Sequence, residues 1–280
     1  MQIKYLGTAA AEGIPALFCN CNVCTEARKR GGRNIRTRSQ ALVDNKILID
    51  FNADTYMHCI NGNVDLSEID HCLITHAHED HLYVNDLATR IPGFSNLGNN
   101  KPFTLYGTYG VVTKINGFIN SRILDPCGIV EVCQVEPYTT FNVGDYKVTP
   151  LVAWHDVRSF PVIYIIENPR GKKLLYAHDT NYFLDEVWGY LEKNKHRFDF
   201  VSLDCTEANK PELDYVGHMN LNDCNRVKDR LLDMGCVGED TVFCLNHFSH
   251  NGTDVLYEEF SSVAKEKGFL VSYDNMEVEF

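Results

Sequence analysis

The sequence has no long apolar run, and this absence narrows the class of protein first. No stretch of its 280 residues approaches the ~20 consecutive apolar residues that cross a bilayer, so we expect no membrane segment. The start, Met1–Gly7, lacks the apolar region of a signal peptide and is expected to form a strand. We therefore expect a cytoplasmic protein.

The sequence also has no internal repeat, no low-complexity segment and no linker rich in proline or serine. A single domain over residues 1–280 is the simplest organisation, with one distinctive cysteine loop at about 19–24. The 11 cysteines are odd in number and scattered, which favours reduced thiols over a disulfide framework.

Positive charge is scarce. Aspartate and glutamate total 38 against 26 lysines and arginines, giving a formal net charge of −12. A protein that grips a long nucleic acid usually presents a basic face, so the balance argues against a nucleic-acid partner. Only Arg28–Arg38 is locally basic. We expect it to be a solvated surface stretch, and whether it contacts an anionic substrate is left open, as is a homodimer.

The segment Thr75–His81 is unusually rich in histidine and acidic residues. It places His76, His78, Asp80 and His81 in six residues behind an apolar run. Such a cluster is costly to fold without a partner, and two divalent metals would resolve the conflict. The spacing assigns the first two histidines to one ion and Asp80 with His81 to the other. Zinc, manganese and iron all accept these ligands, and geometry selects among them.

Three later polar residues each follow an apolar strand candidate, namely His155, Asp179 and His247. We expect the first to join the ion held by His76 and His78. His247 would join the ion held by Asp80 and His81, with Asp179 bridging both. Taken alone, a histidine at a strand end is more often a hydrogen-bonded structural residue.

A two-metal centre would generate hydroxide near neutral pH and stabilise charge on a phosphoryl or carbonyl group. His218, in a loop before an expected helix, is the candidate general acid, and Asp80 is grouped with it as catalytic. The alternative for His218 is a helix-capping loop residue. Asp50 and Asp204 end apolar strands and would each orient a ligating imidazole, unless they are turn residues.

A second metal signal is C-x-C-x-x-C at Cys19, Cys21 and Cys24. Thiolates at this spacing suit a structural zinc, and His250, three residues after His247, is the natural fourth ligand. The alternatives are a redox-sensitive thiol cluster and plain turn cysteines.

The order of expected elements predicts two sheets packed face to face with helices outside. Asp44-Asn45 between two apolar runs predicts a tight hairpin. The expected helices are Asp54–Ile60, Leu82–Ile91, Thr108–Ile119, Tyr182–Lys193, Asn220–Met234 and Asp254–Lys267.

The pattern H-x-H-x-D-H, followed by a histidine, an aspartate and a final histidine, resembles the metallo-β-lactamase superfamily. The resemblance implies an α+β fold, a four-layer αββα sandwich, and a metal-dependent hydrolase with two catalytic metals, zinc or manganese. The early cysteine motif is similar to that of the phosphodiesterases that open phosphoribosyl 1,2-cyclic phosphate.

That branch implies a structural zinc on the cysteines and His250, and a small, anionic phosphate-ester substrate. Ala177–Thr180 matches the family pattern loosely, and no ribose-recognising residue is evident. The cysteine motif also resembles that of the B protein of pyrroloquinoline quinone biosynthesis, a non-hydrolytic alternative. Arg36-Thr37-Arg38-Ser39 and His247-Phe248-Ser249 resemble the tRNA 3′-processing endonuclease branch.

Overall fold

The computed structural model describes residues 1–98, 101–122, 130–212 and 216–280, and its strands form two mixed sheets. The first has the order β14-β1-β2-β3-β4-β5-β6. Its strands are β1 (Gln2–Gly7), β2 (Gln40–Val43), β3 (Ile47–Ile49), β4 (His71–Leu73), β5 (Phe103–Gly107), β6 (Val130–Gln134) and β14 (Met276–Glu279). The second has the order β13-β12-β11-β10-β9-β8-β7. Its strands are β7 (Phe141–Val143), β8 (Tyr146–Val152), β9 (Val162–Glu167), β10 (Lys173–Ala177), β11 (Phe200–Asp204), β12 (Val242–Asn246) and β13 (Leu270–Val271).

The two sheets repeat one arrangement. In the first, β14 and β1 to β3 are antiparallel neighbours, and β3 to β6 run parallel. In the second, β7 to β10 are antiparallel and β10 to β13 run parallel. Parallel strands end at the same edge of a sheet, so each sheet gathers several carboxyl-terminal strand ends at one edge.

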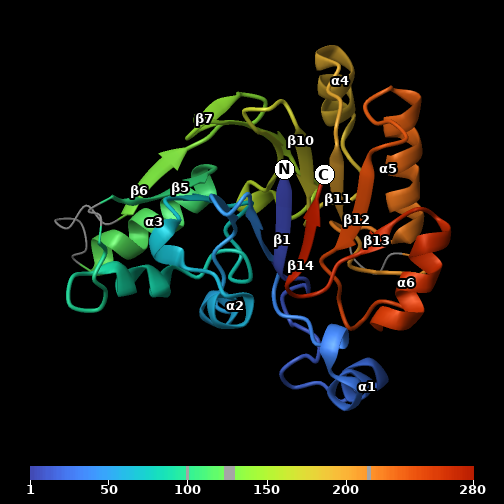
Figure 1. The fold of residues 1–280 in the computed structure, drawn as a ribbon, viewed down its shortest axis with the longest axis horizontal. Coiled ribbons are helices and arrows are strands. Elements are labelled where there is room, and N and C mark those ends of the chain that lie inside the picture. Colours follow the sequence, from blue (N-terminus) through green and yellow to red (C-terminus); the bar gives the residue numbers. More distant parts are fainter. Residues whose placement is uncertain (99–100, 123–129, 213–215) are drawn as a thin grey trace.

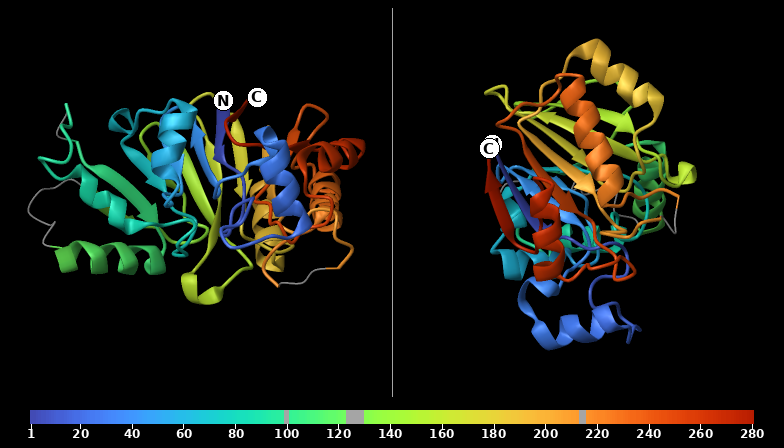
Figure 2. Two further views of the ribbon diagram at one scale, coloured as in Figure 1. Left: turned by 90° about the horizontal axis from the view of Figure 1, so that it is seen from below. Right: turned by 90° about the vertical axis from the view of Figure 1, so that its right-hand side faces the viewer.

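Helices cover the outer face of each sheet (Figures 1 and 2). Alternate strand residues explain the layering, because both faces of each sheet are buried. In β10, Leu174 and Tyr176 join the core between the sheets, whereas Leu175 and Ala177 pack under the helices. The helices over the second sheet are α4 (Asp185–Asn194), α5 (Leu221–Asp233) and α6 (Tyr257–Glu266). On the other side lie α2 (Thr55–Gly62) and α3 (Tyr109–Arg122). The expected four-layer αββα sandwich is confirmed.

The expected helices exist in five of six cases, with ends displaced by a few residues. The exception is Leu82–Ile91, which is a 3₁₀ helix over Val84–Arg90. The backbone explains the difference. The Leu82 amide bonds the His78 carbonyl, and Tyr83 pairs with Phe51, so this part of the chain is committed to the histidine loop. None of the helices in the described ranges is long and apolar enough to cross a bilayer.

The hairpin at Asp44-Asn45 is confirmed, since both residues have positive φ, 48° and 53°, between antiparallel β2 and β3. A helix that the sequence did not predict, α1 (Asn22–Arg30), follows the cysteine motif. It begins at Cys21, whose side chain accepts from the Cys24 amide, and it ends at Gly31. It stands out below the sheets in Figure 1.

The basic run Arg28–Arg38 is not uniformly solvated, which corrects the expectation from sequence. Arg36 is only 2% exposed and lies over the Phe248 ring at 4.3 Å. Its Nη1 donates to the Thr8 hydroxyl and to the Ser272 carbonyl. Burial lowers the pKa of Arg36 to about 10, which leaves it charged at neutral pH. The side chain therefore connects the end of β1 to the segments that follow β12 and β13.

Replacing Arg36 with alanine should lower the free energy of unfolding by about 3–5 kcal/mol, because a buried carbonyl and hydroxyl lose their charged donor. Urea unfolding followed by circular dichroism measures the change. The exposed Arg33, stacked on Tyr273 at 4.2 Å, is the control, and its alanine variant should lose about 1 kcal/mol or less. Equal losses in both variants would contradict this account of Arg36.

Candidate metal centre

The sequence-predicted ligands come together where strand ends of the two sheets meet. His76 and His81 follow β4, His155 follows β8, Asp179 follows β10 and His247 follows β12. Asp179 and His247 have positive φ, 52° and 65°, immediately after their strands. This backbone conformation costs about 1–3 kcal/mol in a non-glycine residue and is typical of functional sites. In this conformation the two side chains meet, with Asp179 Oδ2 lying 2.9 Å from His247 Nε2.

Three imidazoles form the first group. His76 Nε2 lies 2.9 Å from His78 Nδ1, and His155 Nε2 lies 3.3 Å from the same nitrogen. His76 is fully buried. Hydrogen bonds between three neutral imidazoles cannot satisfy all of these converging nitrogens. A divalent cation could be coordinated by all three.

The second group contains carboxylates as well as imidazoles. His81 Nε2 lies 3.3 Å from Asp80 Oδ2 and 2.8 Å from Asp179 Oδ2. His247 Nε2 approaches the same Asp179 oxygen at 2.9 Å. In the described part of the chain, His81 Nε2, His247 Nε2 and Asp179 Oδ2 are buried without a hydrogen-bond partner of acceptable geometry. Three buried polar atoms aimed at one point fit a divalent metal there.

Asp179 faces both groups. Its Oδ1 lies 3.6 Å from His155 Nε2 in the first group, and its Oδ2 contacts His81 and His247 in the second. A carboxylate placed in this way can bridge two ions, one on each oxygen. The donors present thus fit two divalent metals. The first group offers three nitrogens and one carboxylate oxygen, and the second offers two nitrogens and two carboxylate oxygens.

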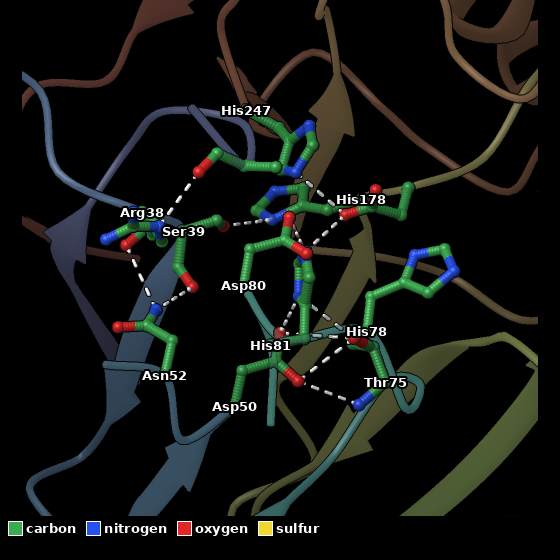
Figure 3. A network of polar contacts seen from close by, with 12 residues as sticks. Arg38, Ser39, Asp50, Asn52, Thr75, His78, Asp80, His81, His178 and His247 are labelled. Carbon is green, nitrogen blue, oxygen red and sulfur yellow. Dashed lines mark hydrogen bonds and ion pairs between the residues drawn. The ribbon is translucent and has the colours of Figure 1, made fainter. Parts of the chain in front are cut away.

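Carboxylates contact the outer ring nitrogens of the metal-facing imidazoles. Asp50 Oδ2 lies 2.7 Å from His81 Nδ1, and its Oδ1 accepts from the amide and hydroxyl of Thr75 (Figure 3). Burial raises the pKa of Asp50, and the neighbouring His81 opposes that shift. A carboxylate on the outer nitrogen fixes the tautomer and direction of the ring.

Asp204 holds two histidines at once. Its Oδ2 lies 3.0 Å from His218 Nδ1 and 3.5 Å from His247 Nδ1. Thr206 Oγ1, which the sequence reasoning missed, lies 2.9 Å from His247 Nδ1. Burial opposes the charged ring of His218, but the Asp204 carboxylate outweighs it and raises the pKa of His218 to about 9.

Two further supporting residues were not predicted. Asp156 Oδ2 lies 3.4 Å from His78 Nε2, on the side of that ring away from the cluster. Lys114 of α3 donates to the Ala77 carbonyl and pairs with Glu79 at 2.9 Å, which fastens the ligand loop. Adjacency to His155 could have suggested Asp156. Nothing local marks Lys114, because it approaches from another element.

A pocket of about 290 Å³ opens over the centre. Ligand-group residues, supporting residues and two glutamates line it: Ala10, Ala11, Glu12, His78, Asp80, His155, Asp179, Thr206, Glu207, His218, His247, Ser249 and Asn251. Its volume suits a small ligand, and five of the candidate ligands are among the residues that line it.

The cysteine motif lies next to His250, the residue expected to be its fourth ligand. His250 Nδ1 lies 3.6 Å from Cys19 Sγ and 3.5 Å from Cys21 Sγ, and Cys24 completes a group of four. Burial opposes ionisation of Cys21, but the Cys24 amide and His250 lower its pKa to about 6. Burial raises the pKa of Cys24 to about 12. Three sulfurs and one imidazole nitrogen are a donor set for tetrahedral zinc.

The profile of the beta-lactamase superfamily domain matches residues 45–234, more than half of the chain. The chain belongs to this superfamily. Divalent metal binding follows from the fold, and membership supports a hydrolase.

Curated proteins whose sequences are similar to this chain have different names and functions. The chain is 26% identical to an octanoyltransferase of Porphyromonas gingivalis over 55% of this chain and 31% of that protein. It is 30% identical to coenzyme PQQ synthesis protein B of Methylobacterium radiotolerans over 45% and 42%. It is 25% identical to ribonuclease Z of Staphylococcus saprophyticus over 60% and 50%. The matched parts span half or less of each of these relatives.

Two solved structures superpose over the whole chain. Zinc-bound PqqB of Methylobacterium extorquens gives a TM-score of 0.74 at 19% identity and is covered completely. A diphosphatase of the PhnP family gives 0.74 at 19% identity, with 97% of its chain covered. At this identity the likeness bears on the fold alone.

Changing Asp50 to asparagine should weaken metal binding at the His81 position about 10- to 100-fold, because the outer nitrogen of that ring loses its carboxylate. Competition with a chromogenic chelator measures the affinity. Asp65→Asn, at an exposed position, is the control and should bind metal like the parent chain. Unchanged affinity in Asp50→Asn would refute the orienting role of Asp50.

Proposed function

We propose that the chain is a metal-dependent phosphodiesterase that acts on a small, anionic phosphate ester, cyclic esters included. The observation that carries the proposal is the position of His218, a histidine outside both ligand groups yet beside them. Its ring centroid lies 4.9 Å from that of His155 and 5.5 Å from that of His247. When bound, two divalent ions supply a hydroxide nucleophile and stabilise charge on the phosphoryl oxygens.

His218 would then supply the proton that the leaving group needs. With Nδ1 held by Asp204 at 3.0 Å, Nε2 is the nitrogen that can donate to a bound ester. The raised pKa keeps the ring protonated at neutral pH. Asp80 and Asp179 contribute negative charge that fixes the metal-facing imidazoles, and the supporting carboxylates Asp50 and Asp204 hold those rings in place.

Pocket size and charge support a small substrate. A volume of about 290 Å³ accommodates a compact phosphate ester, and the net charge of −12 disfavours a polynucleotide. The diphosphatase among the structural neighbours supports phosphorus chemistry on this fold. Zinc or manganese is proposed for the catalytic pair, and zinc for the cysteine group with His250. The ten described cysteines are unpaired, which supports a cytoplasmic location.

A second candidate is an RNA hydrolase, and the ribonuclease Z relative is the observation that favours it. The same centre would cleave a phosphodiester of a tRNA precursor. The net charge of −12 argues against it, because RNA binding depends on neutralising phosphate charge. The PQQ synthesis relative points instead to a metalloprotein that does not hydrolyse its ligand, and the position of His218 argues against that alternative.

Turnover of a chromogenic phosphodiester with added Mn²⁺ or Zn²⁺ tests the proposal. We expect hydrolysis that is abolished in His76→Ala and Asp179→Ala, because each removes a metal-facing group. A tRNA precursor assayed at physiological salt separates the two candidates. Cleavage of the precursor in preference to small diesters would favour the RNA hydrolase, and full metal loading without hydrolysis of any ester would favour the non-hydrolytic alternative.

A comparison of two substrates with different leaving groups tests whether His218 is the general acid. His218→Ala should slow hydrolysis of an alkyl phosphodiester about 100-fold or more, since an alkoxide needs a proton, and should slow a nitrophenyl ester much less. Metal content should stay at the parent value in this variant. Equal effects on the two esters would show that His218 is not the general acid.

The same role has a pH signature. A general acid must be protonated, so the rate on the alkyl ester should fall as pH rises through the His218 pKa of about 9. In Asp204→Asn the falling limb should move to lower pH, because the carboxylate that raises this pKa is gone. A limb that stays in place would contradict the pairing.

A further inference from the structure

One glutamate lies between the two candidate metal sites. Glu12 lines the pocket over the histidine centre, and its Oε1 lies 3.6 Å from His250 Nε2. The same oxygen accepts a short hydrogen bond from the hydroxyl of Ser249, which also lines the pocket. Its side chain is 31% exposed, so it belongs partly to the protein interior and partly to the pocket.

The two nitrogens of His250 face opposite neighbours. Nδ1 points to the sulfurs of Cys19 and Cys21, and Nε2 points to Glu12. A metal-bound imidazole usually donates its other N–H to a carboxylate, which fixes the ring and makes it a stronger ligand. Glu12 is in the place where that carboxylate belongs.

The backbone prevents Glu12 and Ser249 from drifting apart. The Ala10 amide donates to the Phe248 carbonyl at 2.9 Å, and Phe248 donates back to the Thr8 carbonyl at the same distance. The Asn251 amide in turn donates to the Ser249 hydroxyl at 3.1 Å. The segment from His247 to Asn251 therefore joins the cysteine site to the pocket within five residues.

Only one oxygen of Glu12 is engaged in this way. Over the described ranges of the chain, its Oε2 makes no hydrogen bond or ion pair. Because Glu12 lines the pocket, this oxygen remains able to accept a hydrogen bond from an occupant of that pocket. The direction of this second oxygen then depends on His250 and Ser249 remaining in place.

We propose that Glu12 couples the cysteine site to the catalytic pocket, as a positioning residue that orients His250 and forms a wall of the pocket. A metal on Cys19, Cys21, Cys24 and His250 thus sets the shape of a pocket whose own ions it does not touch. Loss of that metal frees the His250 side chain, and the Glu12 carboxylate that faces it reorients in the pocket wall. Substrate affinity falls as a result, while the catalytic ions stay bound.

Metal release from the full-length chain tests the structural half of this coupling. Cobalt loaded at the cysteines gives thiolate-to-cobalt absorption, which the imidazole and carboxylate centre lacks, so release to a chelator reports that site alone. Glu12→Ala should release this cobalt about tenfold faster than the parent chain, and Glu12→Gln should fall between them. Glu239→Gln, an exposed residue in the loop before β12, should match the parent.

Steady-state kinetics test the other half, which rests on the proposed phosphodiesterase activity, whereas cobalt release does not. Glu12→Ala and Cys19→Ser should each raise KM severalfold on a chromogenic phosphodiester with kcat unchanged. The double variant should be no worse than either single one, because both act through the same contact. An inactive parent chain would remove the proposed activity and leave the cobalt result standing.

Two outcomes would overturn the coupling. The first is cobalt release from Glu12→Ala at the parent rate. The second is a parent-like KM in Cys19→Ser alongside a raised KM in Glu12→Ala, since Glu12 would then act on the pocket without the cysteine site. If Cys19→Ser does not fold, the parent chain stripped of its cysteine-site metal replaces it in the same comparison.

Discussion

The constraint on which the rest of the structure depends is a single buried carboxylate between two groups of histidines. Asp179 is 3% exposed, and its two oxygens face His155 on one side and His81 with His247 on the other. Holding this arrangement requires strand ends from both sheets, a strained backbone at two ligands, and carboxylates behind the rings. Each of these is an expense in folding that bound divalent metal would offset, because converging buried lone pairs are otherwise uncompensated.

Much of the fold and of the site could be predicted from the sequence, for a local reason. The candidate ligands His76 to His81 are close in sequence, and the later ones each follow an apolar strand, so the strand ends of the two sheets bring them together. What could not be predicted arises from contacts between distant segments. Arg36 looked like part of a solvated run until Phe248 and Ser272 were seen to bury it. Similarly, the histidine loop replaces an expected α-helix with a 3₁₀ helix. A role for Glu12 could not be inferred until the structure placed it next to His250.

The two candidate metal sites are joined by one short segment, which places the cysteine group next to the pocket over the histidine centre. His247 belongs to the histidine centre and His250 to the cysteines, three residues apart in a segment pinned to the first sheet through Thr8 and Ala10. The superfamily hosts many activities on one scaffold, so specificity resides in such loops rather than in the sheets. In this chain the pocket lining combines Glu12, which contacts His250, with imidazoles of the histidine centre.

The two-ion centre bridged by Asp179 is the central claim, and anomalous diffraction from crystals grown with zinc tests it most directly. Data collected at the zinc absorption edge should show two peaks about 3.5–4 Å apart on either side of the Asp179 carboxylate. A single peak among the histidines, with Asp179 bound to one ion only or to none, would contradict the account.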